Sequence, residues 1–163
     1  MNFRKKIVSL RSLKRIIVRF KKQRKTIAFT NGCFDILHYG HVSYLNAAKK
    51  PNRVLVVGLN SDASVQRIKG TGRPIVSEKS RAAVLASLAC VDYVVIFRED
   101  TPLGIIKTLK PDILIKGADW KQKDIVGAEI VKSHGGRVEF IKYEEHFSAS
   151  SIIQSILKNA KDR

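Results

Sequence analysis

The chain has 163 residues and a mass of 18.3 kDa, about the size of one domain, so a two-domain enzyme is not expected. Lysine and arginine number 31 against 14 aspartate and glutamate, and this net charge of +17 suggests a nucleic-acid or anionic-membrane partner. A content of 44% hydrophobic and 28% charged residues excludes disordered, collagen-like and low-complexity classes.

Much of the positive charge lies at the N-terminus. Residues 1–25 contain eleven basic side chains and no acidic one, whereas the rest has 20 basic against 14 acidic, a net charge of +6. Apolar residues recur at helical spacing, which predicts a basic amphipathic N-terminal helix within 1–25, ahead of a domain spanning 26–163; they are Leu10, Leu13, Ile17 and Phe20. In one interpretation this stripe packs on the domain. In the other, the helix docks on anionic lipid or nucleic acid.

The two cysteines, Cys33 and Cys90, match no metal-binding or redox spacing, so we expect reduced thiols in a cytoplasmic protein. No apolar run approaches the ~20 residues of a membrane span, and no secretory signal is recognisable. No cluster of carboxylates suggests a dedicated metal site.

After the leader, short apolar runs alternate with helical patterns. The expected strands are 26–30, 53–59, 93–97, 112–115 and 138–141, and the expected helices are 40–49, one that begins after Ser77, 101–110, 125–134 and 148–158. Strands that are apolar on both faces and alternate with helices indicate an α/β fold. We expect a Rossmann-like, doubly wound, five-stranded parallel sheet with helices on both faces and its ligand site at the carboxyl ends of the strands.

Helix ends and buried helix faces can also be predicted. Ser77 suits an N-cap, and Thr101 can cap the next helix with Pro102 in its first position. The helical spacing points several apolar side chains inward, namely Val84, Leu85 and Leu88 after Ser77, and Ile152, Ile153, Ile156 and Leu157 in the last helix.

The first expected strand leads into residues 30–41, TNGCFDILHYGH, where the fold places ligands. His38 and His41 flank the start of a helix, and Gly40 allows a ligand to approach the backbone. A helix start supplies free amide donors and the positive end of the helix dipole, so this segment suits a phosphate group. A zinc site or two incidental histidines are the alternatives for the motif alone.

The string NGCFDILHYGH resembles the signature of the cytidylyltransferase-like nucleotidyltransferases, relatives of the HIGH-motif enzymes. The stretches 60–102 and 109–120 resemble the adenylyltransferases of ADP-heptose synthesis, in a match that covers roughly residues 26–158. Because no sugar-kinase domain is expected, the chain resembles their stand-alone form. The resemblance implies transfer of AMP from ATP, with Mg²⁺, to D-glycero-β-D-manno-heptose 1-phosphate, giving ADP-heptose and pyrophosphate. It also implies a homodimer and no nucleic-acid partner.

The resemblance further assigns roles to residues. His38, His41 and Lys69 would be catalytic, because they contact the phosphates and stabilise the charge that develops on the α-phosphate. Nucleotide-binding roles fall on Thr30, Asn31, Gly32, Cys33, Phe34, Gly40, Arg73, Gly117, Asp119, Trp120, Ser148 and Ser150. Asp35 and Asn60 lie at the ends of expected strands that face the same pocket, so they are assigned, with Lys116, to the sugar phosphate.

Two positions depart from the pattern of the family. Ala149 lacks a hydroxyl where the family has a Ser-Thr-Thr motif, and Tyr143 stands where the glycerol-phosphate cytidylyltransferase branch has arginine. His134 is expected at a helix end and His146 in a loop. The alternatives are a cytidylyltransferase for glycerol or ethanolamine phosphate, and a non-catalytic nucleotide-binding module whose basic helix binds nucleic acid or membrane.

Overall fold

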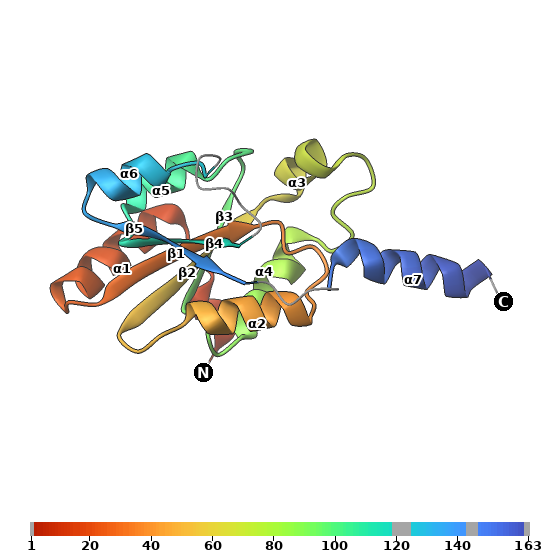
Figure 1. The fold of residues 1–163 in the computed structure, drawn as a ribbon, viewed down its shortest axis with the longest axis horizontal. Coiled ribbons are helices and arrows are strands. Elements are labelled where there is room, and N and C mark those ends of the chain that lie inside the picture. Colours follow the sequence, from red (N-terminus) through yellow and green to blue (C-terminus); the bar gives the residue numbers. More distant parts are fainter. Residues whose placement is uncertain (1, 119–124, 143–146, 162–163) are drawn as a thin grey trace.

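The computed structural model describes residues 2–118, 125–142 and 147–161. Its centre is a five-stranded sheet in the order β3-β2-β1-β4-β5, in which all neighbouring strands are parallel (Figure 1). The strands are β1 Thr26–Gly32, β2 Arg53–Asn60, β3 Tyr93–Phe97, β4 Ile113–Gly117 and β5 Arg137–Ile141. The predicted doubly wound parallel sheet is therefore confirmed.

Helices cover both faces of the sheet (Figure 1). The described helices are the 3-10 helix η1 Phe3–Lys6, α1 Leu10–Lys22, α2 Tyr39–Ala48, α3 Asp62–Lys69, α4 Glu78–Ser87, α5 Leu103–Leu109, α6 Ala128–Ser133 and α7 Ala149–Lys161. Side chains of α1, α5 and α6 pack on one face and those of α2 and α4 on the other. The core thus consists of two hydrophobic clusters, the first under α1, α5 and α6 and the second under α2 and α4. Successive side chains of β2 alternate between them, because Val54 and Val56 belong to the first and Leu55 and Val57 to the second.

The N-terminal segment is part of this fold. Leu13 and Ile17 of α1 are 0% and 3% exposed and belong to the first cluster, and Leu10 and Phe20 pack against it. The backbone N–H of Val8 donates to the carbonyl of Val94, so the segment also covers edge strand β3. The packed-stripe interpretation of the basic helix is thus confirmed.

Helix α3 is an element that the apolar periodicity does not predict. Its sequence is mainly polar, and Val65 is its only buried large apolar side chain. The helix depends on its N-cap, because Ser61 Oγ accepts from the N–H of Ser64 at 3.3 Å. Ser61 followed by Asp62 is a local sign of a helix start, because serine is a preferred N-cap and an acidic side chain is favourable in the first turn.

Helix ends were predicted with mixed success. Ser77 caps α4 as expected, whereas α5 begins at Leu103 with Pro102 in the cap position, so the expected cap at Thr101 is wrong. The expectation that Val84 points inward is also wrong, because it is 46% exposed on the outer side of α4.

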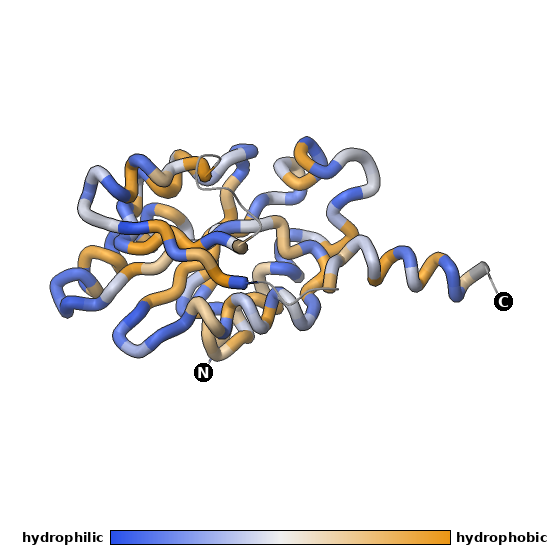
Figure 2. The backbone as a smooth tube through the Cα atoms, in the orientation of Figure 1, coloured by the Kyte–Doolittle hydropathy of each residue, from blue (hydrophilic) through white to orange (hydrophobic). Residues whose placement is uncertain are grey.

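Helix α7 extends away from the sheet toward the C-terminus (Figure 1). Ile152 and Ile153 are half-buried, whereas Ile156 and Leu157 are 59% and 57% exposed, so the expected inward packing of the latter two is wrong. Figure 2 shows apolar and polar segments alternating along this helix. Within the described residues, no helix combines the length and apolar character needed to cross a bilayer.

A partly buried ion pair ties β5 to the start of β2. Arg53, whose side chain is 5% exposed, donates through Nη1 and Nη2 to the two carboxylate oxygens of Glu139 at 3.1 and 3.0 Å. The hydrogen bond from Arg53, with that from Lys50, lowers the pKa of Glu139 to about 2. Because this pKa lies below its unfolded value, the ionised pair stabilises the fold above about pH 4.5 and this contribution is lost as the pH falls toward 2.

We expect Glu139→Gln to lower the free energy of unfolding by about 2 kcal/mol at pH 7, because the buried Arg53 would lose the charge of its partly buried partner. Urea denaturation at pH 7 and at about pH 4 measures the difference in the free energy of unfolding between the parent and the variant. This difference should be smaller at the lower pH. The matched control is Glu129→Gln, since that carboxylate is 87% exposed and, among the described residues, its ion-pair partner is Lys132, three positions along the same helix. Equal losses in the two variants would contradict the prediction.

Candidate active site

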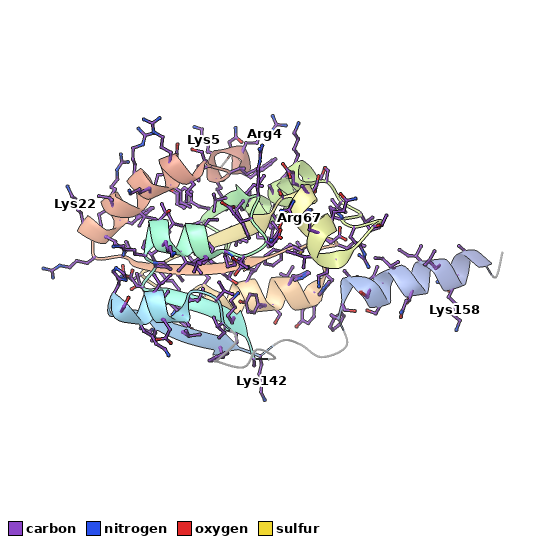
Figure 3. The ribbon with its side chains drawn as sticks, turned by 90° about the horizontal axis from the view of Figure 1, so that it is seen from above. Arg4, Lys5, Lys22, Arg67, Lys142 and Lys158 are labelled. Atoms are coloured by element: carbon purple, nitrogen blue, oxygen red, sulfur yellow. The ribbon has the colours of Figure 1, made fainter. Side chains whose placement is uncertain are left out.

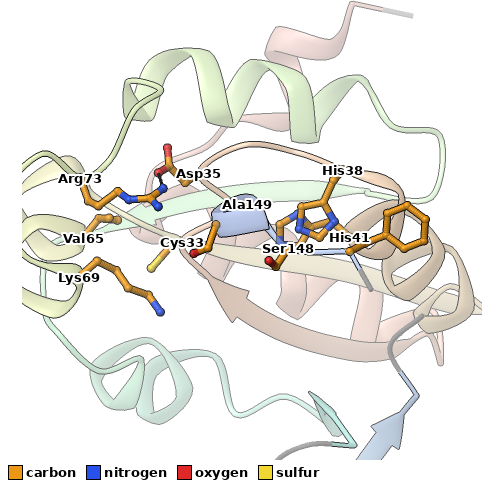
Figure 4. A pocket seen from close by; sticks show the side chains of 11 residues that line it. Cys33, Asp35, His38, His41, Val65, Lys69, Arg73, Ser148 and Ala149 are labelled. Atoms are coloured by element: carbon orange, nitrogen blue, oxygen red, sulfur yellow. Dashed lines mark hydrogen bonds and ion pairs between the residues drawn. The ribbon is translucent and has the colours of Figure 1, made fainter. Parts of the chain in front are cut away.

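A cavity of about 630 Å³ opens at the carboxyl end of β1 (Figure 4). Its walls come from the loop after β1, the first turn of α2, helix α3 with the loop that follows it, and the start of α7. It brings together eight of the residues assigned from the sequence: Cys33, Asp35, His38, His41, Lys69, Arg73, Ser148 and Ser150. Val65, Phe147 and Ala149 complete the described lining.

The two histidines of the motif stack on one another at the start of α2. Their ring centroids are 3.8 Å apart, and the ring of Phe34 lies 5.1 Å from that of His41. Burial lowers the pKa of His38, and burial together with the neighbouring His38 lowers the pKa of His41 to about 4. Both imidazoles are therefore neutral at pH 7, and each offers one N–H donor.

The histidine pair has unused hydrogen-bonding capacity. The Nδ1 atoms of His38 and His41 are both buried without a hydrogen-bond partner in the described part of the chain. Gly40 makes the close packing possible, because a Cβ there would lie 3.2 Å from His38 Nδ1 and 3.3 Å from Phe147 Cβ. A side chain at this position would therefore force His38 or Phe147 to shift by a few tenths of an ångström.

Two cations face the histidines across the cavity (Figure 4). Lys69 is the last residue of α3 and is exposed, and its ammonium forms no ion pair with a described residue. Arg73 Nη1 lies 2.9 Å from Asp35 Oδ2, an ion pair in which the Arg73 side chain remains 24% exposed. The cavity therefore has two positive groups on one side and two neutral donors on the other.

Asp35 holds the loop that carries Arg73. Besides the arginine, its carboxylate accepts the backbone N–H groups of Ile75 and Val76 at 2.8 and 3.0 Å. With three donors and a side chain that is only 8% exposed, this carboxylate is occupied by the protein itself. The geometry supports a positioning role for Asp35 and gives no support to direct binding of the sugar phosphate.

Arg81 is a supporting residue that sequence reasoning missed. Its fully buried guanidinium donates to the carbonyls of Val76 and Cys33 and, at 2.7 Å, to Asp62 Oδ1. It thereby joins the loop after α3, the loop after β1 and the start of α3. The available signal in the sequence was the position of Arg81, four residues before Leu85, on the side of the expected helix that was predicted to face inward.

The start of α7 forms the third side of the cavity. Ser148 Oγ accepts from the N–H of Ser151 at 3.0 Å, the hydrogen bond of an N-cap, and Ser148 and Ser150 both line the cavity. The starts of α2 and α7 thus meet at one cavity, and both direct the positive ends of their dipoles there. This arrangement suits a ligand with several phosphate groups.

Other assigned residues lie beside the cavity or beneath it. Thr30 is buried and its Oγ1 is 2.8 Å from Tyr44 Oη, and Asn60 Nδ2 donates to Ser64 Oγ at 2.9 Å. Lys116 Nζ donates to Asn31 Oδ1 at 2.7 Å, linking the ends of β4 and β1. Outside the described lining are Thr30, Asn31, Gly32, Phe34, Gly40, Asn60, Lys116 and Gly117.

Some expectations fall outside the described residues, namely those for Asp119, Trp120, Tyr143 and His146. His134 ends α6 as expected, and its Nδ1 lies 2.8 Å from the carbonyl oxygen of Ile130. No cluster of three or more His, Cys, Asp or Glu side chains suited to a metal occurs in the described ranges.

Comparisons with known proteins agree with this geometry. Residues 29–156 match the family described as Cytidylyltransferase-like. The chain is 56% identical over 156 residues to the bifunctional protein HldE of Campylobacter jejuni and 54% identical over 153 residues to that of Geobacter metallireducens. These matches cover 96% and 94% of this chain but 32% and 31% of the relatives, so the chain spans about a third of their length.

A solved structure shows the same fold. The lipopolysaccharide core biosynthesis protein from Thermoplasma volcanium superposes with a TM-score of 0.60 at 29% identity, covering 75% of this chain and 98% of that one. The predicted family is confirmed, and the chain belongs to the cytidylyltransferase-like family.

Proposed function

We propose that the chain is an adenylyltransferase that joins AMP from ATP to D-glycero-β-D-manno-heptose 1-phosphate and releases pyrophosphate. The observation that carries this proposal is the stacked pair His38 and His41 at the start of α2, facing Lys69 and Arg73 across one cavity. The identity to HldE proteins and the likeness to a lipopolysaccharide core biosynthesis protein support ADP-heptose as the product.

In the proposed reaction, an oxygen of the sugar phosphate attacks the α-phosphorus of ATP. A new P–O bond forms, the bond between the α-phosphorus and the bridging oxygen to the β-phosphate breaks, and pyrophosphate leaves with that electron pair. The attacking oxygen is already anionic, so no general base is required. Catalysis then depends on position and electrostatics, as is usual for transfer of phosphoryl groups.

The cavity residues divide this task. The neutral imidazoles of His38 and His41 donate hydrogen bonds to α-phosphate oxygens, where negative charge increases in the transition state. Lys69 and Arg73 neutralise the triphosphate, and the amides and hydroxyls at the start of α7 bind the β- and γ-phosphates. Stacked neutral rings avoid the repulsion that two imidazolium ions 3.8 Å apart would suffer.

The described residues do not form a protein site for Mg²⁺. Asp35, the carboxylate of the lining, is occupied by three protein donors, so the protein side of the cavity offers cations and neutral groups. In our proposal Mg²⁺ arrives on the triphosphate, where it neutralises phosphate charge. The expected homodimer and cytoplasmic location stay predictions.

The reaction is tested by pyrophosphate release with each of ATP, CTP, GTP and UTP, combined in turn with the heptose phosphate and with glycerol phosphate. We expect ATP with the heptose phosphate to be favoured over every other pair by at least about tenfold in kcat/KM. Preference for CTP with glycerol phosphate would replace the proposal by the cytidylyltransferase alternative. Nucleotide binding without release from any pair would favour the non-catalytic module.

Removing one imidazole tests the transition-state role. We expect His41→Ala to lower kcat about 10²–10³-fold, the usual cost of losing one donor to developing negative charge. The control is His134→Ala, since His134 follows the end of α6, its ring contacts Ser133 and Ile130 among the described residues, and it lies outside the described cavity lining. Circular dichroism would show that both variants fold. Full activity of His41→Ala would contradict the mechanism.

The protonation state of the pair can be measured directly. Because burial favours the neutral ring, NMR signals of the His41 imidazole should not titrate between about pH 8 and pH 5.5 and should shift only as the pH approaches 4. Comparison with His41→Ala assigns the signal. A midpoint near 6.5, the value of an unperturbed histidine, would show that the ring is solvated and contradict the proposed neutral donor.

A further inference from the structure

The outer face of α1 carries a band of basic side chains that the proposed catalysis does not use. Its members in α1 are Arg11, Lys14, Arg15, Arg19 and Lys22, all exposed. Neighbouring α5 adds the exposed Lys107 and Lys110, and Figure 3 shows Lys22 at the end of α1. We name this surface the basic face.

The charge of the basic face is not compensated by described residues. None of the five α1 cations of the basic face forms an ion pair or a side-chain hydrogen bond within the described residues, and the first carboxylate of the sequence is Asp35. Lys21 is the α1 residue that does pair, with its Nζ 3.3 Å from Asp112 Oδ1. So dense a positive field attracts an anionic partner.

Helix α1 is fixed on the body. Leu13 and Ile17 are almost wholly buried, and the ring of Phe20 lies 6.1 Å from that of Tyr93. The apolar stripe is therefore used within the fold and is not available to insert into a membrane. A partner of the basic face has to be recognised by charge at the surface.

We infer that the basic face docks on a bilayer surface rich in anionic phospholipid headgroups. The 13 residues of α1 form a straight array about 20 Å long. Arg11, Arg15, Val18 and Lys22 follow one another at intervals of four, three and four, so they lie in line along the exposed side. Clusters of four to eight Lys or Arg side chains on a helix are typical of binding to anionic lipids.

The same geometry disfavours nucleic acid. Phe3 and Phe20, the aromatic residues of the leader, are partly buried against the two core clusters, so their rings are poorly placed for bases to stack on. A helix that reads the major groove has to project from its domain, whereas α1 lies along the sheet and contacts α5, β1 and β3. A row of cations along an exposed helix that lies flat on its domain fits a plane of headgroups better than a groove.

Docking through the basic face leaves the cavity open. The cavity is lined by the loop after β1 and by segments of α2, α3 and α7, and no residue of α1 belongs to its described lining. The family match begins at residue 29, so the basic face of α1 also lies outside the region that defines the family. Membrane docking is thus an addition to the proposed catalysis and does not depend on it.

The experiment is co-sedimentation of the full chain with vesicles of phosphatidylcholine alone or with about 30% phosphatidylglycerol. We expect at least about tenfold stronger binding to the anionic vesicles in about 50 mM NaCl, and loss of most of that binding in about 500 mM NaCl, because salt screens surface charge. The test variant is Arg11→Gln/Arg15→Gln/Lys22→Gln. The matched control removes the same charge elsewhere, Lys79→Gln/Lys142→Gln/Lys158→Gln, at exposed positions outside the basic face.

The test variant should lose about tenfold or more of the vesicle affinity and the control variant little, while both keep the unfolding midpoint of the parent protein. Equal losses in the two triple variants would overturn the inference, because net charge alone would then explain the binding. Absence of binding to anionic vesicles would overturn it as well. A DNA duplex of about 20 base pairs that binds more tightly than the vesicles and displaces them would also overturn it, in favour of nucleic acid.

Discussion

The cavity depends on one carboxylate, that of Asp35. A parallel sheet brings the ends of its strands together, but it does not by itself orient the loops that leave them. Asp35, just past β1, binds Arg73 and two backbone amides of the loop after α3. Buried Arg81 adds to this junction between the loop after β1 and the loop after α3, since it donates to a backbone carbonyl in each of them. Lys69 and Arg73 can face the histidines because these two loops are tied together.

The same junction decides how charge is distributed in the cavity. The Asp35 carboxylate is paired with Arg73 and accepts two backbone amides, so its negative charge in the cavity is partly offset, and the pair in turn reduces the positive charge that Arg73 contributes. Burial keeps the opposite wall neutral by lowering the pKa values of His38 and His41. In the proposed complex the triphosphate would meet the exposed Lys69 on one wall and neutral donors on the other.

Much of the fold could be predicted from the sequence, because the five strands are apolar, short and separated by turn residues such as Gly135 and Gly136. Helix α3 could not, since its stability comes from a capping serine and its contacts with neighbouring loops. The end of α7 shows the opposite error. The helix was predicted, but Ile156 and Leu157 are exposed, because helical spacing does not reveal whether the rest of the protein packs against that side of the helix. Motif residues predicted much of the cavity, but Arg81 was missed because its partners are backbone carbonyls and an aspartate nineteen positions away.

Helix α1 has two faces with separate demands on its sequence. Its inner side completes the core, so Leu13 and Ile17 are constrained by packing, much as any strand residue is. Its outer side contacts solvent, and substitutions there are nearly neutral for folding. The charge of this surface can therefore change from one protein to another without altering the fold or the cavity. Deletion of the whole N-terminal segment, by contrast, would expose one face of the sheet. Such a deletion would remove the basic surface and part of the core together, so the effects of the two losses could not be separated.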